Sequence, residues 1–159
     1  VRMMKKVHEE IKQTRPFPTL EEEAVVSLAR TQGKIDHAFA DLIKPYGLTP
    51  SLYNILRILR GAGQSGLCRY EVGDRMITPA PDVTRLLDRL ERKGYVTRER
   101  DNENRRLVKS MITKSGLDVL DRLDDPVNEF HRRHLGHLGD DRLKGLIESL
   151  ALARAAESE

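Results

Sequence analysis

Basic side chains are concentrated in one short part of the sequence. From Arg85 to Lys109 the chain carries nine Lys and Arg residues against five Asp and Glu residues, whereas the whole 159-residue chain has 28 against 25. A local excess of cationic side chains favours a polyanion as partner, because guanidinium and ammonium groups form charge-assisted hydrogen bonds with phosphate. This segment is therefore expected to bind a polyanion such as nucleic acid, and the alternative is an ordinary solvated charged surface.

Three histidines offer a weaker possibility of metal chemistry. His131, His134 and His137 stand three residues apart, a spacing that drifts across one helix face and could approach a metal site. Gly136 argues against a continuous helix, and two neighbouring arginines would repel a cation. A polar helix end is the favoured interpretation and a metal site the alternative.

Cys68 is the single cysteine, so an internal disulfide is excluded, which fits a reducing compartment. It stands where a short helix is expected to begin, and a helix dipole there can lower a thiol pKa, so oxidant sensing stays open. The favoured interpretation is a small residue in place of a hydroxyl cap. Asp124-Asp125 precedes Pro126, which fits a helix kink better than paired catalytic carboxylates. We therefore expect no enzyme, no cofactor and no metal.

The composition is that of one folded subunit. Charged residues make up 33% of the chain and hydrophobic residues 38%, and charges interrupt every apolar stretch well before the roughly 18 residues that a membrane span needs. The segment from Val1 to Lys6 lacks the apolar core of a signal peptide. We expect no contact with a membrane and a cytoplasmic location.

Capping residues predict the helices of the amino-terminal half. Thr19 and Glu22 have the spacing of a capping box, which predicts a helix from there to about residue 44. Thr49 followed by Pro50 predicts a second helix with a buried stripe of leucines and isoleucines. Residues 69–76 are long enough for only a short third helix.

A fourth helix and a hairpin are predicted next. Residues 78–82 have the composition of a helix start, and the helix is expected to run to Lys93. Its predicted inward positions are Val83, Leu86, Leu87 and Leu90, and its predicted outward positions are Thr84, Arg85, Asp88, Arg89 and Arg92. Gly94 ends it, and two β-prone runs, 95–100 and 106–112, flank a polar turn at 101–105.

Two further helices follow the hairpin. Thr113 is expected to cap a helix containing Leu117, and Asp140 a last helix. The apolar stripes of the first and last helices exceed what a small monomer can cover, so we expect a homodimer. The predicted fold is mainly α with a small β-hairpin. Residues 46–113 form a winged helix-turn-helix lobe, and 1–45 and 114–159 form the dimerisation helices of a single subunit.

The stretch from Val83 to Val96, followed by Arg98, Asn104-Arg105-Arg106 and Ile112 to Gly116, resembles the signature region of the MarR family of transcriptional regulators. The resemblance implies a homodimer that binds double-stranded DNA at a palindromic operator and releases it when a small molecule binds. It implies a repressor. Oxidant-sensing branches of the family carry a cysteine near the first helix, where this chain has none.

Transferred by position, Thr84 and Arg85 would contact the major groove, and Arg105 and Arg106 would act at the wing tip. Two departures stand out. Pro81 and Asp82 replace the usual hydroxyl residues at the start of the recognition helix, and this places an acid near phosphates unless Asp82 caps the helix. Asn104 replaces the usual acid of the wing, and this substitutes a neutral hydrogen bond for an ion pair. The candidate DNA contacts are Pro81, Asp82, Thr84, Arg85, Arg89, Arg98, Arg100, Arg105 and Arg106.

An effector site is expected in the crevice between the dimer helices and the winged lobe. If the family arrangement holds, His37, Tyr53, Arg57 and Leu117 converge there. Arg57 suits an anion, so a small carboxylated aromatic is the expected class of ligand. Two alternatives stay open: a ligand- or redox-sensing winged-helix dimer that has lost operator binding, and a protein-interaction adaptor that dimerises through its terminal helices.

Overall fold

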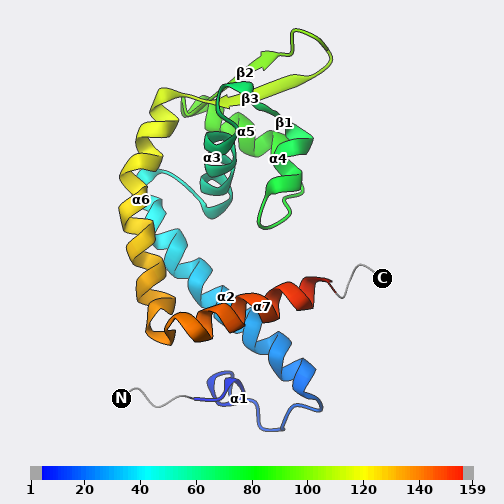
Figure 1. Ribbon diagram of the computed structural model, residues 1–159, viewed down its shortest axis with the longest axis vertical. Coiled ribbons are helices and arrows are strands. Elements are labelled where there is room, and N and C mark those ends of the chain that lie inside the picture. Colours follow the sequence, from blue (N-terminus) through cyan, green and yellow to red (C-terminus); the bar gives the residue numbers. More distant parts are fainter. Residues whose placement is uncertain (1–4, 156–159) are drawn as a thin grey trace. The chain divides into compact units, whose positions relative to one another are not determined.

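The computed structural model describes residues 5–155 (Figure 1). Within them lie the helices α1 (Val7–Glu10), α2 (Leu20–Ile43), α3 (Pro50–Ala62), α4 (Arg69–Arg75), α5 (Val83–Arg92), α6 (Lys114–Leu135) and α7 (Asp140–Ala155). The strands are β1 (Leu67–Cys68), β2 (Val96–Arg100) and β3 (Val108–Ile112), and short 3-10 turns cover Lys44–Tyr46, Gly63–Ser65 and Gly136–Leu138. The predicted class, mainly α with a small β-hairpin, is confirmed.

The chain forms two compact units, the first ending at Asp41 and the second beginning at Leu42. In the first unit, α2 starts where the capping box predicted, because the Glu22 amide donates to Thr19 Oγ1 at 3.1 Å. The carboxylate of Glu10 accepts hydrogen bonds from Lys34 Nζ at 2.5 Å and Arg30 Nε at 3.4 Å. These contacts attach the short α1 to α2.

Helix α3 supplies the centre of the winged lobe. Thr49 Oγ1 accepts from the Leu52 amide at 3.4 Å, and Pro50 is the first helical residue, as predicted. The predicted stripe is buried, and it consists of Leu52, Ile55, Leu56 and Leu59. Helix α3 contacts α4, α5, α6 and β3, so it fixes the position of the recognition elements around it.

The sheet has three antiparallel strands in the order β1-β3-β2. The hairpin of β2 and β3 was predicted, but β1 was not, and Arg106 lies in the turn rather than in a strand. Strand β1 pairs Leu67 with Ser110. Gly66 permits this approach, because it has a φ of +62° and a Cβ there would lie 2.9 Å from the Ser110 carbonyl.

The beginning of α6 is closely attached to the end of α5 and the start of β2. The Gly116 amide donates to Thr113 Oγ1 at 3.1 Å, which confirms the predicted cap. Thr113 also donates its hydroxyl to Gly94 O at 2.6 Å and its amide to Tyr95 O at 3.0 Å. A Cβ at Gly116 would lie 2.5 Å from Tyr95 O, so the contact requires glycine.

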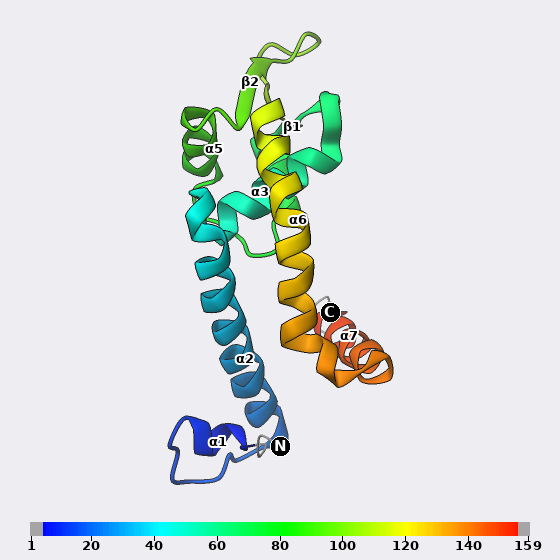
Figure 2. The same ribbon diagram turned by 90° about the vertical axis from the view of Figure 1, so that its left-hand side faces the viewer.

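Helix α6 is a continuous ribbon from this junction to its end (Figure 2), and Pro126 lies within it. Helix α7 is different, because none of its described residues is buried. Ile147 and Leu152 are 65% and 66% exposed. In the described part of the chain, neither these helices nor the others contain a segment apolar and long enough to cross a bilayer.

Candidate DNA-binding surface

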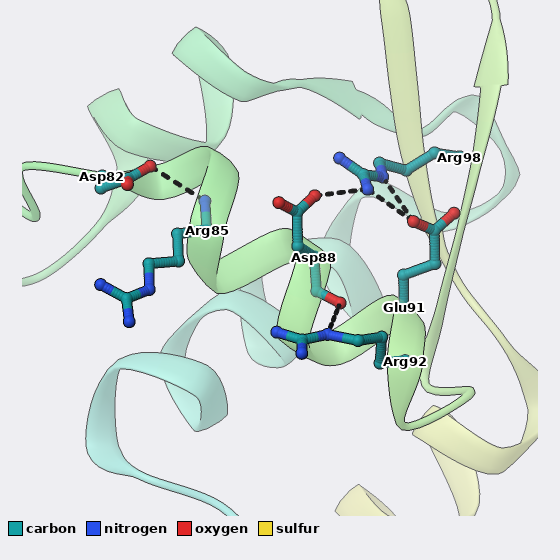
Figure 3. Close-up of polar contacts among 6 residues, drawn as sticks. All are labelled: Asp82, Arg85, Asp88, Glu91, Arg92 and Arg98. Carbon is teal, nitrogen blue, oxygen red and sulfur yellow. Dashed lines mark hydrogen bonds and ion pairs between the residues drawn. The ribbon is translucent and has the colours of Figure 1, made fainter.

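Helix α5 is held in the lobe by one face. Leu87 and Leu90 are buried, whereas Thr84 and Arg85 are exposed. Asp82 caps the helix, since its Oδ1 accepts from the Arg85 amide at 2.9 Å (Figure 3). The acid that replaces the expected hydroxyl residue therefore has a local partner, and it complements the positive end of the helix.

The outer surface of α5 carries two sets of charges. Arg85, Arg89 and Arg92 follow one another at i, i+4 and i+7 and so share a face. Asp88 and Glu91 lie beside this face and are contacted by Arg98 of β2. Arg98 Nη2 lies 2.5 Å from an oxygen of each carboxylate, and its Nε donates to Glu91 at 3.0 Å. Figure 3 shows Arg85 and Arg92 extending away from Arg98.

Arg98 therefore links the wing to the recognition helix. Its side chain is 24% exposed. Its hydrogen bond to Glu91, with a smaller contribution from that to Asp88, raises the pKa of Arg98, whereas burial lowers it. The guanidinium that the sequence placed among the DNA contacts is occupied by two acids of α5. This pairing joins two elements and offsets one of the two negative charges of the acids.

The wing tip has an internal brace that the sequence analysis missed. Asp101 Oδ1 accepts from the amides of Glu103 and Asn104 at 2.9 and 2.8 Å, and Asp101 pairs with Lys109. The Lys109 hydrogen bond, followed by that of the Asn104 amide, lowers the pKa of Asp101. Asn104 itself accepts a hydrogen bond from the Arg106 amide at 3.2 Å. An aspartate two residues before an exposed turn amide is the signal for such a brace.

The remaining arginines of the wing are available to a partner. Arg100, Arg105 and Arg106 are exposed. The hairpin extends past α3, α4 and α5 (Figure 1). A basic strip beside a fixed helix can bind phosphates or enter a narrow minor groove.

A groove of about 600 Å³ lies along the arginine face of α5. Its lining residues are Ser51, Ala80, Pro81, Asp82, Arg85, Leu86, Arg89 and Arg92. It therefore lies between the start of α3, the loop before α5, and α5 itself. Of the predicted DNA contacts, Pro81, Asp82, Arg85 and Arg89 are brought together in it.

Cys68 has the environment of a structural residue. It is 3% exposed and is the N-cap of α4, and its amide donates to Glu71 Oε2 at 2.8 Å. Burial and then the charge of Glu71 raise the pKa of its thiol. The lowered pKa considered from the sequence is therefore wrong, because desolvation and a nearby carboxylate disfavour the thiolate.

The histidines of α6 have aromatic and backbone partners. His134 Nδ1 lies 2.8 Å from Phe130 O, and its ring centroid is 4.0 Å from that of Phe130. His137 lies beyond the end of α6 in a 3-10 turn, in agreement with the helix break expected at Gly136. Across residues 5–155, no three His, Cys, Asp or Glu side chains are grouped to hold a metal ion.

The residues expected to bind an effector are distributed over both units. Arg57 Nη1 donates to Tyr53 Oη at 3.0 Å, and the Arg57 guanidinium lies 5.9 Å from the ring centroid. Leu117 is half-buried on α6. His37 belongs to the first unit, where its side chain is 84% exposed and lies 3.7 Å from Asp41. The convergence of all four stays a prediction.

Comparisons with known proteins agree on one family. The sequence model of the MarR family matches residues 48–108. A MarR transcription factor from Planctomyces limnophilus, known from its crystal structure, is 38% identical, with 86% of this chain and 99% of that chain covered and a TM-score of 0.65. The transcriptional repressor CouR, solved bound to a 23-mer DNA duplex, is 26% identical, with 89% and 99% covered and a TM-score of 0.76.

A curated relative with a matched sequence is the HTH-type transcriptional regulator PapX of Escherichia coli. It is 31% identical over 94 residues, which cover 59% of this chain. The match spans 57% of the length of PapX.

Proposed function

Because this chain belongs to the MarR family, we propose that it is a DNA-binding transcriptional regulator, that it acts as a homodimeric repressor, and that a small molecule releases it from a palindromic operator. The observation that carries the proposal is that exposed arginines lie both on α5 and on the wing. Arg85 and Thr84 stand on a helix fixed by Leu87 and Leu90, and such a helix can enter a major groove. CouR, solved on a DNA duplex, supports this use of the fold.

The two arginine sets would have different roles. Arg85, near the amino end of α5, is placed to read base edges, because recognition helices contact bases with their first turns. Arg100, Arg105 and Arg106 would contribute affinity through phosphates or the minor-groove potential. Pro81 and Thr84 would add apolar and hydroxyl contacts beside Arg85. Arg98 would act by positioning the wing.

The experiment is a binding titration with the full chain. Duplex DNA from the region upstream of its own gene is compared with a random duplex of equal length over a series of salt concentrations. We expect tight binding to an inverted repeat, weaker binding to the random duplex, and a linear fall of log K with log salt for both. Absence of salt-dependent duplex binding would overturn the proposal. The adaptor alternative predicts that result.

A dimer is supported by the apolar surface of the terminal helices. Leu20 and Val25 on α2 are 81% and 64% exposed, and Ile147 and Leu152 on α7 are similarly open. Exposed apolar side chains in this number favour a self-complementary interface. A two-fold dimer would present two copies of α5 about 34 Å apart, which is the separation of successive major grooves.

Release by an effector would act on that separation. A ligand that prefers a dimer with the wrong spacing lowers operator affinity, and by reciprocity operator DNA lowers ligand affinity by the same factor. Arg57 beside Tyr53 suits a carboxylated aromatic. Calorimetry with small carboxylated aromatic compounds tests this: an effector must bind free protein more tightly than the protein–operator complex. Unchanged affinity after substitution of His37 and Arg57 would contradict the location.

The alternative of a sensor that has lost operator binding rests on Pro81, Asp82 and Asn104. The hydrogen bonds of Asp82 and Asn104 argue against this alternative. Asp82 uses its carboxylate as a helix cap, and Asn104 closes the wing turn through a backbone amide. The acid of the pair, Asp82, therefore has a local partner.

A further inference from the structure

We propose that the groove along α5 seats one sugar-phosphate strand of duplex DNA, with Arg92 as a backbone contact on one wall and Ser51 on the other. The inference rests on the proposed DNA-binding function and specifies which surface provides sequence-independent affinity. Neither Arg92 nor Ser51 is among the contacts expected from the sequence. Both line the groove of about 600 Å³.

The first argument is the availability of the arginines. Within residues 5–155, the terminal nitrogens of Arg85, Arg89 and Arg92 have no hydrogen-bond or ion-pair partner, and Arg92 uses only Nε, toward Asp88 O at 3.4 Å. Arg98 is different, since Asp88 and Glu91 occupy its guanidinium. Arg98 offsets one of the two negative charges of these acids, and the three groove arginines exceed that remaining charge and the charge of Asp82, so the groove keeps a net positive charge. An anion is the complementary occupant.

The spacing favours a row of anions over a single one. Arg85 and Arg92 are seven residues apart, so they are separated by roughly 10 Å along the helix axis. A DNA strand presents successive charges along the groove, so Arg92 can contact the backbone while Arg85, at the amino end of α5, reads a base edge.

The opposite wall adds a helix amino end and apolar contacts. Ser51 is the second residue of α3, and the first turn of α3 contains no acid. Thr49 caps the Leu52 amide, and the remaining partial positive charge of this end adds to the wall of the groove that Ser51 lines. Ala80, Pro81 and Leu86 offer apolar surface for deoxyribose. The Asp82 carboxylate is directed to the Arg85 amide, so the acid in the lining has its own partner.

The first test removes one guanidinium. Arg92→Ala is compared with Arg122→Ala, a matched control because Arg122 Nε makes the same 3.4 Å bond to the carbonyl four residues earlier, on α6. We expect Arg92→Ala to weaken binding to operator and random duplex equally, by roughly fivefold at 0.15 M salt, and to reduce the salt slope by about one. Arg92→Lys should retain the slope, and Arg122→Ala should match the wild type.

The second test adds a negative charge to the other wall. Ser51→Glu places a carboxylate in the first turn of α3, where it favours the helix, so loss of binding would not come from unfolding. The control is Ser115→Glu, the same change at the second residue of α6, whose first turn also lacks an acid. We expect weaker binding to both duplexes for Ser51→Glu alone, with thermal unfolding unchanged or raised in both variants.

The outcomes separate this inference from the proposed function. If the wild type binds DNA with the expected salt dependence but Arg92→Ala and Ser51→Glu match their controls, the groove inference is overturned and the proposed function stands. If polyglutamate competes as well as random duplex in an Arg92-dependent manner, the groove is a general anion site and the inference is also overturned. Absence of salt-dependent duplex binding by the wild type would overturn the proposed function itself.

Discussion

The guanidinium of Arg60 forms two hydrogen bonds with the carboxylate of Asp124, each 2.9 Å long. Arg60 lies on α3 and Asp124 on α6, so the pair joins the centre of the winged lobe to the long helix that leaves it. The side chains are 27% and 40% exposed. The hydrogen bond from Arg60 lowers the pKa of Asp124 despite partial burial, and that of Arg60 is raised.

Asp124→Asn should lower the free energy of unfolding by about 1 kcal/mol at pH 7, since a two-point charge-assisted contact is lost but solvent screens part of it. Asp121→Asn is the control, because Asp121 is 70% exposed and lies 3.6 Å from Arg60. It should have a smaller effect. Urea unfolding of the three proteins measures the difference.

The contribution of Asp124 should depend on pH in a defined direction. A lowered pKa in the folded state means that the stabilisation is present above the ordinary carboxyl pKa of 3.8 and is lost as the pH falls through the folded value. The gap in stability between wild type and Asp124→Asn should therefore close in acid. A gap that stays constant down to full protonation would contradict the ion pair.

Arg98→Ala should weaken DNA binding on operator and random duplex alike, on the order of tenfold, because it leaves both negative charges of Asp88 and Glu91 uncompensated on the recognition helix. The triple variant with Asp88→Asn and Glu91→Gln distinguishes the mechanism. Restored affinity in that variant indicates that Arg98 acts by offsetting the charge of the two acids. If affinity stays low when both acids are gone, Arg98 acts by positioning the wing or by contacting DNA directly.

Arg85→Ala and Arg105→Ala should affect DNA binding in different ways. If Arg85 reads a base, its loss costs roughly 1–3 kcal/mol on the operator and little on random DNA. Loss of Arg105 or Arg106 should affect both duplexes and lower the salt slope by about one per phosphate contact. Fluorescence anisotropy on the two duplexes provides the comparison, and equal losses for Arg85→Ala would reassign it to the backbone.

Ile147→Glu with Leu152→Glu should dissociate the dimer while the winged lobe stays folded, because these α7 side chains are exposed in a single chain and distant in sequence from its core. Glu148→Gln, on the same helix, is the matched control. Light scattering and circular dichroism report mass and helix content. A wild-type chain that is a stable monomer at micromolar concentration would refute the dimer.

Asp101→Ala should loosen the wing tip without affecting the core, because the Glu103 and Asn104 amides lose their acceptor and Lys109 its partner. Hydrogen exchange at these two amides should accelerate, with unchanged exchange in α3. Asn102→Ala, in the same turn, is the control. Unchanged exchange at Glu103 and Asn104 would mean that Asp101 does not hold the turn.

Helix boundaries were predictable because their causes are local. Thr19, Thr49 and Thr113 each accept a hydrogen bond from an amide three residues later. This information lies within a few residues of sequence. The two-residue strand β1 was not predictable, because it exists through pairing with distant Ser110 and a glycine that permits the approach.

The residue types of the candidate site were predictable from the sequence, but their hydrogen-bond and ion-pair partners were not. An arginine on the wing was expected to contact DNA, yet the partners of Arg98 lie on α5, ten and seven residues earlier. Arg92 was placed on the outward face without being distinguished from its neighbours. Its availability follows from the pairing of Asp88 and Glu91 with another element, which is a tertiary relationship.

The close contact of Gly116 at the start of α6 couples the orientation of this helix to that of the wing. Gly116 packs against Tyr95 with no space for a Cβ, and Thr113 is bonded to both Gly94 and Tyr95. The wing and the first turn of α6 therefore turn together. The 22 residues of α6 extend roughly 33 Å. A tilt of the helix by about 5° at its first turn therefore displaces its far end by about 3 Å.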